Sequence, residues 1–418
     1  MGSARPVALR TLVQERLLVR DLAQLATPRP AAVPARGNDL RAVEVIEDAY
    51  VLCSGGAVEA VGRMRDLALL DDDVEELDGR GSCAIPGLVD CHTHPAFGGD
   101  RVDEFSLRAA GATYEELHAA GGGILSTVAA TRRLGEEELI VRVERHAGWM
   151  LRHGTTTWEG KSGYGLDRDT ELASLRAVRA AGGSPTWLGA HAVPPEQADA
   201  DEYLEWAIAH VLPGAAELAD AADVFLERGA FDAAQARRYL EACRGAGLAL
   251  RIHGDQFTEG GAVPLAIELG ARSVDHLEAT GERGGAALAR SGVVGVLLPA
   301  SALFLDRPQP PARALADAGA AIALATDFNP GSAFTTSLPL VCSLACTQLH
   351  LGPAEALTAM TVNAAFVLGR GDRVGRIVPG LPADLVLLDA PDWRYLSYHL
   401  GGDVVAAVIK AGRPVFRR

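Results

Sequence analysis

Two histidines separated by one residue follow a short apolar run near residue 90. The run AIPGLVDC leads into His92 and His94, with Thr93 between them. If the chain is extended there, residues two apart point to the same face, so both imidazoles turn toward a common point. Imidazole nitrogen is a common ligand of Zn²⁺ and similar cations. The pair therefore indicates a metal site, although the spacing alone fits a structural role equally well.

Other residues of metal-binding type close later apolar runs. His253 follows LALRI, and Asp327 follows AAIALAT. Together with the histidine pair they form a set of nitrogen and carboxylate ligands that leaves positions open for water. Because a bound divalent cation lowers the pKa of water toward about 7, such a site can supply a nucleophile at neutral pH. The set predicts a hydrolytic metal centre.

Two of these strand-end residues are candidates for proton transfer. Asp327 can both ligate a metal and accept a proton from the attacking water. His276, at the end of SVDH, can orient that water and move protons, or it can be a core histidine. The sequence leaves open which of the two is the principal proton acceptor.

The elements that must position these side chains are apolar runs alternating with longer stretches of helical period. Eight runs are candidate strands: residues 84–92, 154–161, 185–193, 223–229, 248–255, 273–278, 293–299 and 320–328. Such alternation predicts an α/β fold with a TIM-like (β/α)8 barrel rather than an open doubly wound sheet. Active sites of such barrels lie at the C-terminal strand ends, which here carry His92, His94, Lys161, His191, Glu227, His253, His276 and Asp327.

The two ends of the chain have a different pattern of short strand-like runs with Gly and Pro at the turns. We predict that residues 1–85 and 370–418 pair into one discontinuous β-sandwich-like domain, with the barrel over 86–369.

Composition limits the classes of partner. A net charge of −15 over 418 residues disfavours nucleic acid and anionic membranes as partners, and an anionic substrate would need a local Arg. Six cysteines without a CxxC pair, and an N-terminus without an uninterrupted apolar run, favour the cytoplasm. The uncharged stretch 329–354 is broken by Pro339, Gln348 and His350, which predicts a buried helix rather than a membrane span.

Several longer motifs resemble a known family. PGLVDCHTH, RIHGDQ, VDH and ATDFNPGS resemble the amidohydrolase superfamily, and GGDRVDEF, AAGGGILSTVAATR, EGKSGYGL and GAHAVP resemble its imidazolonepropionases. The resemblance runs from about residue 84 to 369 and continues weakly into both β segments. It implies hydrolysis of the cyclic amide 4-imidazolone-5-propanoate to N-formimidoyl-L-glutamate, a step of histidine degradation, by a homodimer.

The resemblance also implies roles for individual residues. It implies one Zn²⁺ or Fe²⁺ ion held by His92, His94, His253 and Asp327. It implies substrate contacts from Arg101, Tyr164, His191, Gln256, Asn329, Gly331 and Ser332. We expect Arg101 to hold the propionate with a forked pair of hydrogen bonds, and His191 to support the oxyanion. The NPGS turn is expected to expose backbone N–H groups toward an anion.

Two positions depart from related patterns, and two other readings stay open. Gln256 stands where some family members have Glu, and an amide cannot act as a general base. Lys161 closes the second strand, whereas the bridging Lys of binuclear relatives closes the fourth, so one metal is favoured unless Glu227 is also a ligand. The chain could instead be another amidohydrolase, such as a heterocycle deaminase or different cyclic amidase, or a non-catalytic metal-binding barrel.

Overall fold

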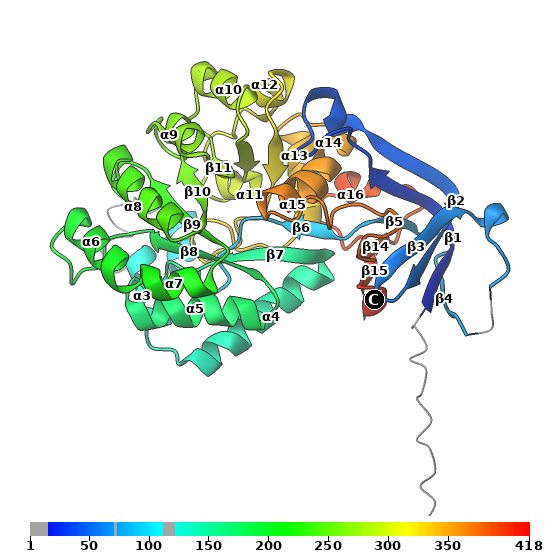
Figure 1. The fold of residues 1–418 in the computed structure, drawn as a ribbon, viewed down its shortest axis with the longest axis horizontal. Coiled ribbons are helices and arrows are strands. Elements are labelled where there is room, and N and C mark those ends of the chain that lie inside the picture. The colour runs from blue at the N-terminus through cyan, green and yellow to red at the C-terminus, as the bar shows by residue number, and fades with distance from the viewer. Residues whose placement is uncertain (1–15, 71–72, 112–121) are drawn as a thin grey trace, which may run out of the picture.

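A computed structural model describes residues 16–70, 73–111 and 122–418 (Figure 1). Two features named from the sequence lie outside these ranges. They are the N-terminal segment on which the localisation prediction partly depends and the first residues of the AAGGGILSTVAATR motif.

Eight parallel strands form one sheet in strict chain order, from β6 to β13. Their bounds are β6 Leu88–Asp90, β7 Thr155–Lys161, β8 Ser184–Ala190, β9 Ala221–Leu226, β10 Ala249–Gly254, β11 Ser273–His276, β12 Val294–Leu297 and β13 Ile322–Leu324. A parallel bridge between Thr93 and Phe328 brings the last strand back to the first. The predicted barrel is confirmed, and its eight candidate strands are all present.

Closure of the barrel occurs at the residues of chemical interest. Asp327 N donates to His92 O at 3.0 Å, and His94 N donates to Phe328 O at 2.8 Å. Backbone hydrogen bonds therefore fix the end of the first strand against the end of the eighth, and the side chains of His92, His94 and Asp327 are brought together by the same contacts that close the sheet.

Helices cover the outside of the barrel (Figure 1). In α5 the apolar Leu172, Leu175 and Val178 recur at three-residue spacing and are buried, and Asp167 caps the first turn by accepting from Thr170 N at 2.9 Å. The barrel helices are α1 Val102–Ala109, α3 Ile124–Thr131, α4 Glu136–Arg152, α5 Arg168–Ala180, α6 Ala200–His210, α7 Leu212–Leu218, α8 Ala233–Gly245, α9 Ala262–Leu269, α10 Glu282–Ala289, α11 Pro299–Phe304, α12 Ala312–Asp317, α13 Leu338–Thr347, α14 Pro353–Thr358 and α15 Ala364–Val367. Shorter elements are η1 Gly37–Arg41, η2 Met64–Asp66, η3 Ala359–Asn363 and α16 Tyr395–Tyr398.

Both chain ends contribute to a second, mixed sheet. Its strands are β1 Arg16–Pro28, β2 Val43–Ser54, β3 Ala57–Arg63, β4 Glu75–Asp78, β5 Cys83–Pro86, β14 Leu385–Leu388, β15 Val405–Lys410 and β16 Arg413–Arg417. Strand β5 joins the two ends, since it pairs parallel to β1 and antiparallel to β14. A β domain built from both termini is thus confirmed, while the boundaries 1–85 and 370–418 stay predictions.

The uncharged stretch 329–354 contains helix α13, whose residues are mostly buried. Its ten residues are too few to cross a bilayer. None of the other helices in the described ranges is both long and apolar enough to do so.

Candidate active site

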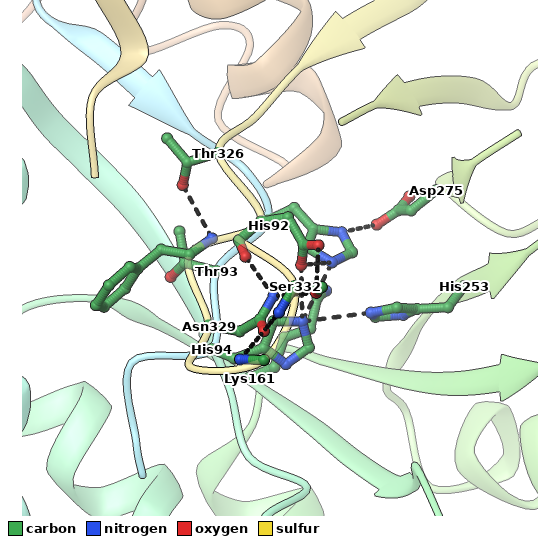
Figure 2. Close-up of polar contacts among 12 residues, drawn as sticks. His92, Thr93, His94, Lys161, His253, Asp275, Thr326, Asn329 and Ser332 are labelled. Atoms are coloured by element: carbon green, nitrogen blue, oxygen red, sulfur yellow. Dashed lines mark hydrogen bonds and ion pairs between the residues drawn. The ribbon is translucent and has the colours of Figure 1, made fainter. Parts of the chain in front are cut away.

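Four side chains converge at the C-terminal end of the barrel (Figure 2). His94 Nε2 lies 3.3 Å from His92 Nε2 and 3.4 Å from His253 Nε2. Asp327 Oδ1 lies 3.5 Å from His92 Nε2 and 3.4 Å from His94 Nε2. All four side chains are almost completely buried. The structure therefore brings together the four residues for which metal ligation was predicted.

The spacing of these atoms fits a divalent cation. Ligand atoms about 2.1 Å from a tetrahedral centre are about 3.4 Å apart, which matches the separations above. Burial lowers the pKa of His94 well below its ordinary value and that of His253 to about 3, so both rings are neutral. Burial opposes ionisation of Asp327, but His92 and His94 hold the pKa of its carboxyl well below the usual range. Two neutral imidazoles and a carboxylate thus meet where a cation can bind.

Two outer carboxylates orient the histidines. Asp275 Oδ2 lies 2.6 Å from His92 Nδ1, and Asp223 Oδ2 lies 3.0 Å from His253 Nδ1. A carboxylate accepts hydrogen bonds, so the proton of each ring is placed on Nδ1 and the lone pair of Nε2 faces the metal position. The tautomers of both histidines therefore suit metal ligation.

A buried ion cluster lies beside these carboxylates. Lys161 Nζ donates to Glu159 at 2.6 Å and to Asp223 at 2.8 Å. Arg251 donates to Glu159 at 2.7 Å and to Asp275 at 2.7 Å. Burial and the charge of Arg251 lower the pKa of Lys161, but Asp223 and Glu159 raise it above the ordinary value. Lys161 is thus held as a paired ammonium rather than as a ligand.

His276 lies beside the metal position in an unusual backbone conformation. Its ring centroid is 5.8 Å from that of His92 and 5.5 Å from that of His253. His276 and Leu277 have φ angles of 88° and 71°, values that non-glycine residues rarely adopt and that cluster at functional sites. Burial lowers the pKa of His276, but Glu278, whose Oε1 lies 3.5 Å from Nδ1, raises it above its ordinary value.

Tyr164 and His191 form one wall of the site. Their ring centroids are 5.3 Å apart, and the His191 ring stacks on His94 at 5.6 Å. His191 Nδ1 lies 3.0 Å from the carbonyl oxygen of Gly163. Burial lowers the pKa of His191 to about 4. Because a carbonyl oxygen only accepts, the neutral ring carries its proton on Nδ1 and presents Nε2 as an acceptor.

The NPGS turn differs from its prediction. The N–H groups of Gly331 and Ser332 both donate to Asn329 Oδ1 at 2.8 Å. Asn329 Nδ2 in turn donates to Asp327 O at 2.6 Å. The expectation that these backbone N–H groups are free for an anion is therefore wrong, because the side chain of Asn329 uses them to fold the turn.

The forked edge of Arg101 is also already occupied. Its Nε and Nη2 donate to Glu104 at 2.8 and 2.5 Å. Glu104 also accepts from Gly123 N at 2.8 Å. The Nη1 of Arg101 lies so close to Gly331 that a Cβ there would be 2.3 Å away. Arg101 thus meets the turn through Nη1. Because Glu104 occupies the Nε–Nη2 edge, the predicted two-bond fork with a ligand would have to use the Nη1–Nη2 edge.

Gln256 lies in the loop after β10, and Glu227 holds that loop. Glu227 Oε2 accepts from the backbone N–H groups of Phe257 at 2.9 Å and Thr258 at 3.3 Å, and Oε1 also accepts from the Thr258 hydroxyl. Glu227 is therefore engaged in folding the loop that carries Gln256. This gives it a role other than the metal ligation considered from the sequence.

Sequence reasoning missed the charged residues that hold the predicted site residues or their loops in place. These are Glu159, Asp223, Arg251, Asp275, Glu104 and Glu171. Strand periodicity contained a signal for two of them. Glu159 is two residues before Lys161 on β7, and Arg251 is two residues before His253 on β10, so each shares the interior face with a residue that was singled out.

Comparison with known proteins identifies the family. Residues 83–415 match the amidohydrolase family. An imidazolonepropionase of Rubrobacter xylanophilus is 61% identical over 95% of this chain and 97% of its own length, and one of Chloroflexus aggregans is 46% identical over 96% and 98%.

Solved structures support the fold alone. A guanine deaminase of E. coli has a TM-score of 0.69 at 16% identity, covering 96% of this chain and 99% of that one. A zinc-bound adenosine deaminase from Xanthomonas campestris has a TM-score of 0.68 at 21% identity, covering 95% of this chain and 92% of that one.

The family follows from the extent and identity of the sequence matches. The chain belongs to the imidazolonepropionase family of amidohydrolases.

Proposed function

We propose that the chain hydrolyses 4-imidazolone-5-propanoate to N-formimidoyl-L-glutamate. The observation that carries the proposal is the position of Arg101 against Gly331, in the turn that directly follows Asp327. Arg101, a cation that can bind the propionate, thus lies next to the four residues proposed to hold the metal. The high identity to proteins named imidazolonepropionase supports the same substrate.

His92, His94, His253 and Asp327 would hold one divalent ion, Zn²⁺ or Fe²⁺, since imidazole and carboxylate suit both. When bound, the ion supplies a Lewis acid that polarises the ring carbonyl and acidifies a water molecule. The pairing of Lys161 with Glu159 and Asp223 supports a single-metal site. Elemental analysis of purified protein measures both the identity and the number of ions.

Proton transfer is assigned to Asp327 and His276. Asp327 is ionised and can take the proton of the attacking water at a carboxylate oxygen. His276, paired with Glu278, can give a proton to the ring nitrogen as the C–N bond breaks. Gln256 can recognise the ring through its amide but cannot be the base.

His191 receives a role different from the one expected from the sequence. Its Nδ1 donates to Gly163, so Nε2 accepts a hydrogen bond from a substrate N–H group rather than donating to the oxyanion. Tyr164 and His191 together would then orient the imidazolone ring. An ion held by the four ligands would supply charge stabilisation for the oxyanion, and His276, whose pKa Glu278 raises, could donate a hydrogen bond to it.

Arg101 is proposed to meet the propionate through its Nη1 edge, with Glu104 keeping the guanidinium in place. Asn329, Gly331 and Ser332 would shape the other side of the carboxylate pocket. The Ser332 hydroxyl accepts from Asn329 Nδ2 at 2.7 Å and donates to Asp327 Oδ2 at 3.4 Å, so it would have to turn from Asp327 to donate to the substrate. This arrangement favours an anionic substrate over an uncharged nucleobase, which has no group for Arg101.

The substrate assignment is tested by assaying freshly generated imidazolone propionate beside guanine and cytosine. We expect turnover of the imidazolone alone. Deamination of either base without ring opening of the imidazolone would instead place the chain with the heterocycle deaminases.

We further propose a cytoplasmic homodimer. All six cysteines are free, which suits a reducing compartment, and the dimer is inferred from the family. Sedimentation equilibrium of the purified chain tests the dimer, and fractionation of expressing cells tests the location.

A further inference from the structure

We propose that Glu171 is a positioning residue that holds the substrate-facing loop 162–166 and, through it, Tyr164 and His191. The inference rests on the proposed function for its catalytic consequence, but its structural claim stands on the loop itself. Glu171 belongs to helix α5, outside the strand ends that supply the other site residues.

The carboxylate of Glu171 lies inside the loop and binds its backbone. Oε1 accepts from Gly163 N at 3.0 Å, Gly165 N at 2.8 Å and Leu166 N at 3.0 Å. Glu171 is 1% exposed. Buried N–H groups without a partner are costly, so one oxygen atom determines the path of this loop.

The glycines of the loop are required by these contacts. Gly163 has a φ of +102°, and a Cβ there would lie 2.8 Å from Leu188 O and 2.9 Å from His191 Nδ1. A Cβ on Gly165 would lie 2.9 Å from Glu171 Oε1. The sequence Gly-Tyr-Gly thus lets Glu171 approach on one side and His191 on the other, with Tyr164 between them.

The loop is hydrogen-bonded both to Glu171 and to His191, a residue of the site. Gly163 donates to Glu171 through its N–H, and its carbonyl accepts from His191 Nδ1. Loss of the carboxyl would release Gly163, and with it the bond that selects the His191 tautomer. Tyr164, the next residue, would move as well. None of the hydrogen bonds described for Glu171 reaches one of the four proposed metal ligands. We therefore expect metal binding to be unaffected.

Three variants separate positioning from general stability. Glu171→Leu removes every acceptor, whereas Glu171→Gln keeps a carbonyl oxygen where Oε1 stands. The control Glu355→Leu removes another buried carboxylate, which binds Arg41, Arg313 and Gly352 N far along the chain. We expect Glu171→Leu to lower kcat/KM about 100-fold with full metal content, since small misplacements cost about that much. Glu171→Gln should recover activity to within about fivefold of the unmodified protein.

An activity-independent readout uses the imidazole ¹H–¹⁵N signals of histidine-labelled protein. The hydrogen-bonded Nδ1–H of His191, assigned with His191→Asn, should persist in Glu171→Gln and in Glu355→Leu and be lost in Glu171→Leu. If Glu171→Leu fails to fold, Glu171→Asp replaces it. Its carboxylate is one methylene shorter and cannot reach the N–H groups of Gly163, Gly165 and Leu166 together, so the His191 signal should be weakened or lost and kcat/KM should fall.

The inference is overturned if Glu171→Leu, or Glu171→Asp in its place, keeps the His191 signal and normal kcat/KM, or if Glu171→Gln is as impaired as Glu171→Leu. Failure of the unmodified protein to open the imidazolone ring would overturn the proposed function instead, and the His191 signal would still test the positioning claim.

Discussion

Two layers of polar side chains inside the barrel differ in how their charges are matched. At the open end, the carboxylate of Asp327 and the Nε2 atoms of three histidines face one another, with neighbouring atoms 3.3–3.5 Å apart. In the neighbouring cluster, the cations Lys161 and Arg251 lie between the carboxylates of Glu159, Asp223 and Asp275. Among the described residues, no Lys or Arg forms an ion pair with the first group, whereas the second contains its own cations.

This difference distinguishes a binding site from a structural ion cluster. Both groups consist of buried polar residues on barrel strands or directly after them, so burial and residue type do not separate them. The match between donors and acceptors does separate them. The paired cluster fixes the rings of His92 and His253, and the unpaired group is left to bind a ligand from outside.

The largest effect is expected where the unmatched group is altered. Asp327→Asn removes a ligand charge and the proposed proton acceptor, so kcat should fall by about 1,000-fold or more. Steady-state ring opening measures it, with metal content determined on the same sample. Turnover like that of the unmodified protein would remove Asp327 from the mechanism.

Altering the matched cluster should affect stability first. Lys161→Met leaves Glu159 and Asp223 buried without their shared partner, so the free energy of unfolding should fall by about 3–5 kcal/mol. Lys410→Met, at an exposed position, is the control and should change it by no more than about 0.5 kcal/mol. Equal effects in urea denaturation would contradict the distinction between the two groups.

A smaller effect is expected at the substrate pocket. Arg101→Ala should raise KM by about 10- to 100-fold with little change in kcat, because a hydrogen bond to a charged group contributes about 1.5–3 kcal/mol. The exposed Arg168→Ala is the control. A fall in kcat at unchanged KM would place Arg101 in the chemical step instead of in anchoring the propionate.

The smallest effect concerns a neutral histidine outside both groups. Burial lowers the pKa of His146 to about 4. Between about pH 6.5 and 4 the unfolded chain therefore binds a proton that the folded chain does not, and stability falls as the pH falls. In His146→Phe this loss should shrink by up to about 1.4 kcal/mol per pH unit, measured by denaturation of metal-free protein. An unchanged pH slope would show that His146 is protonated in the fold.

The fold and the convergence of the four proposed metal ligands could be predicted because their signals are local. Each barrel strand is a short apolar run, and His92, His94, His253 and Asp327 directly follow or end such runs. The pairing of both chain ends into one β domain was predicted as well. The place of β5 between β1 and β14 was not, because it depends on register between distant segments that no local pattern marks. The residues assigned to substrate contact remain predictions, but the structure gives their positions and hydrogen-bond partners.

The partners of the site residues could not be predicted for a physical reason. Glu104 takes the forked edge of Arg101, and Asn329 takes the N–H groups of its own turn, because a short local acceptor competes with any ligand. Glu171 reaches its loop from a helix, where nothing in the helical pattern marks it. Sequence shows which groups can bind, but only the structure shows which are already bound.

The most direct test of the account is ring opening of freshly generated imidazolone propionate, measured on protein as purified, after chelation and after return of a single metal. We expect about one ion per chain, turnover that disappears with the ion, and recovery when it is returned. Undiminished hydrolysis by metal-free protein, or no hydrolysis by protein that carries a full complement of metal, would contradict the account.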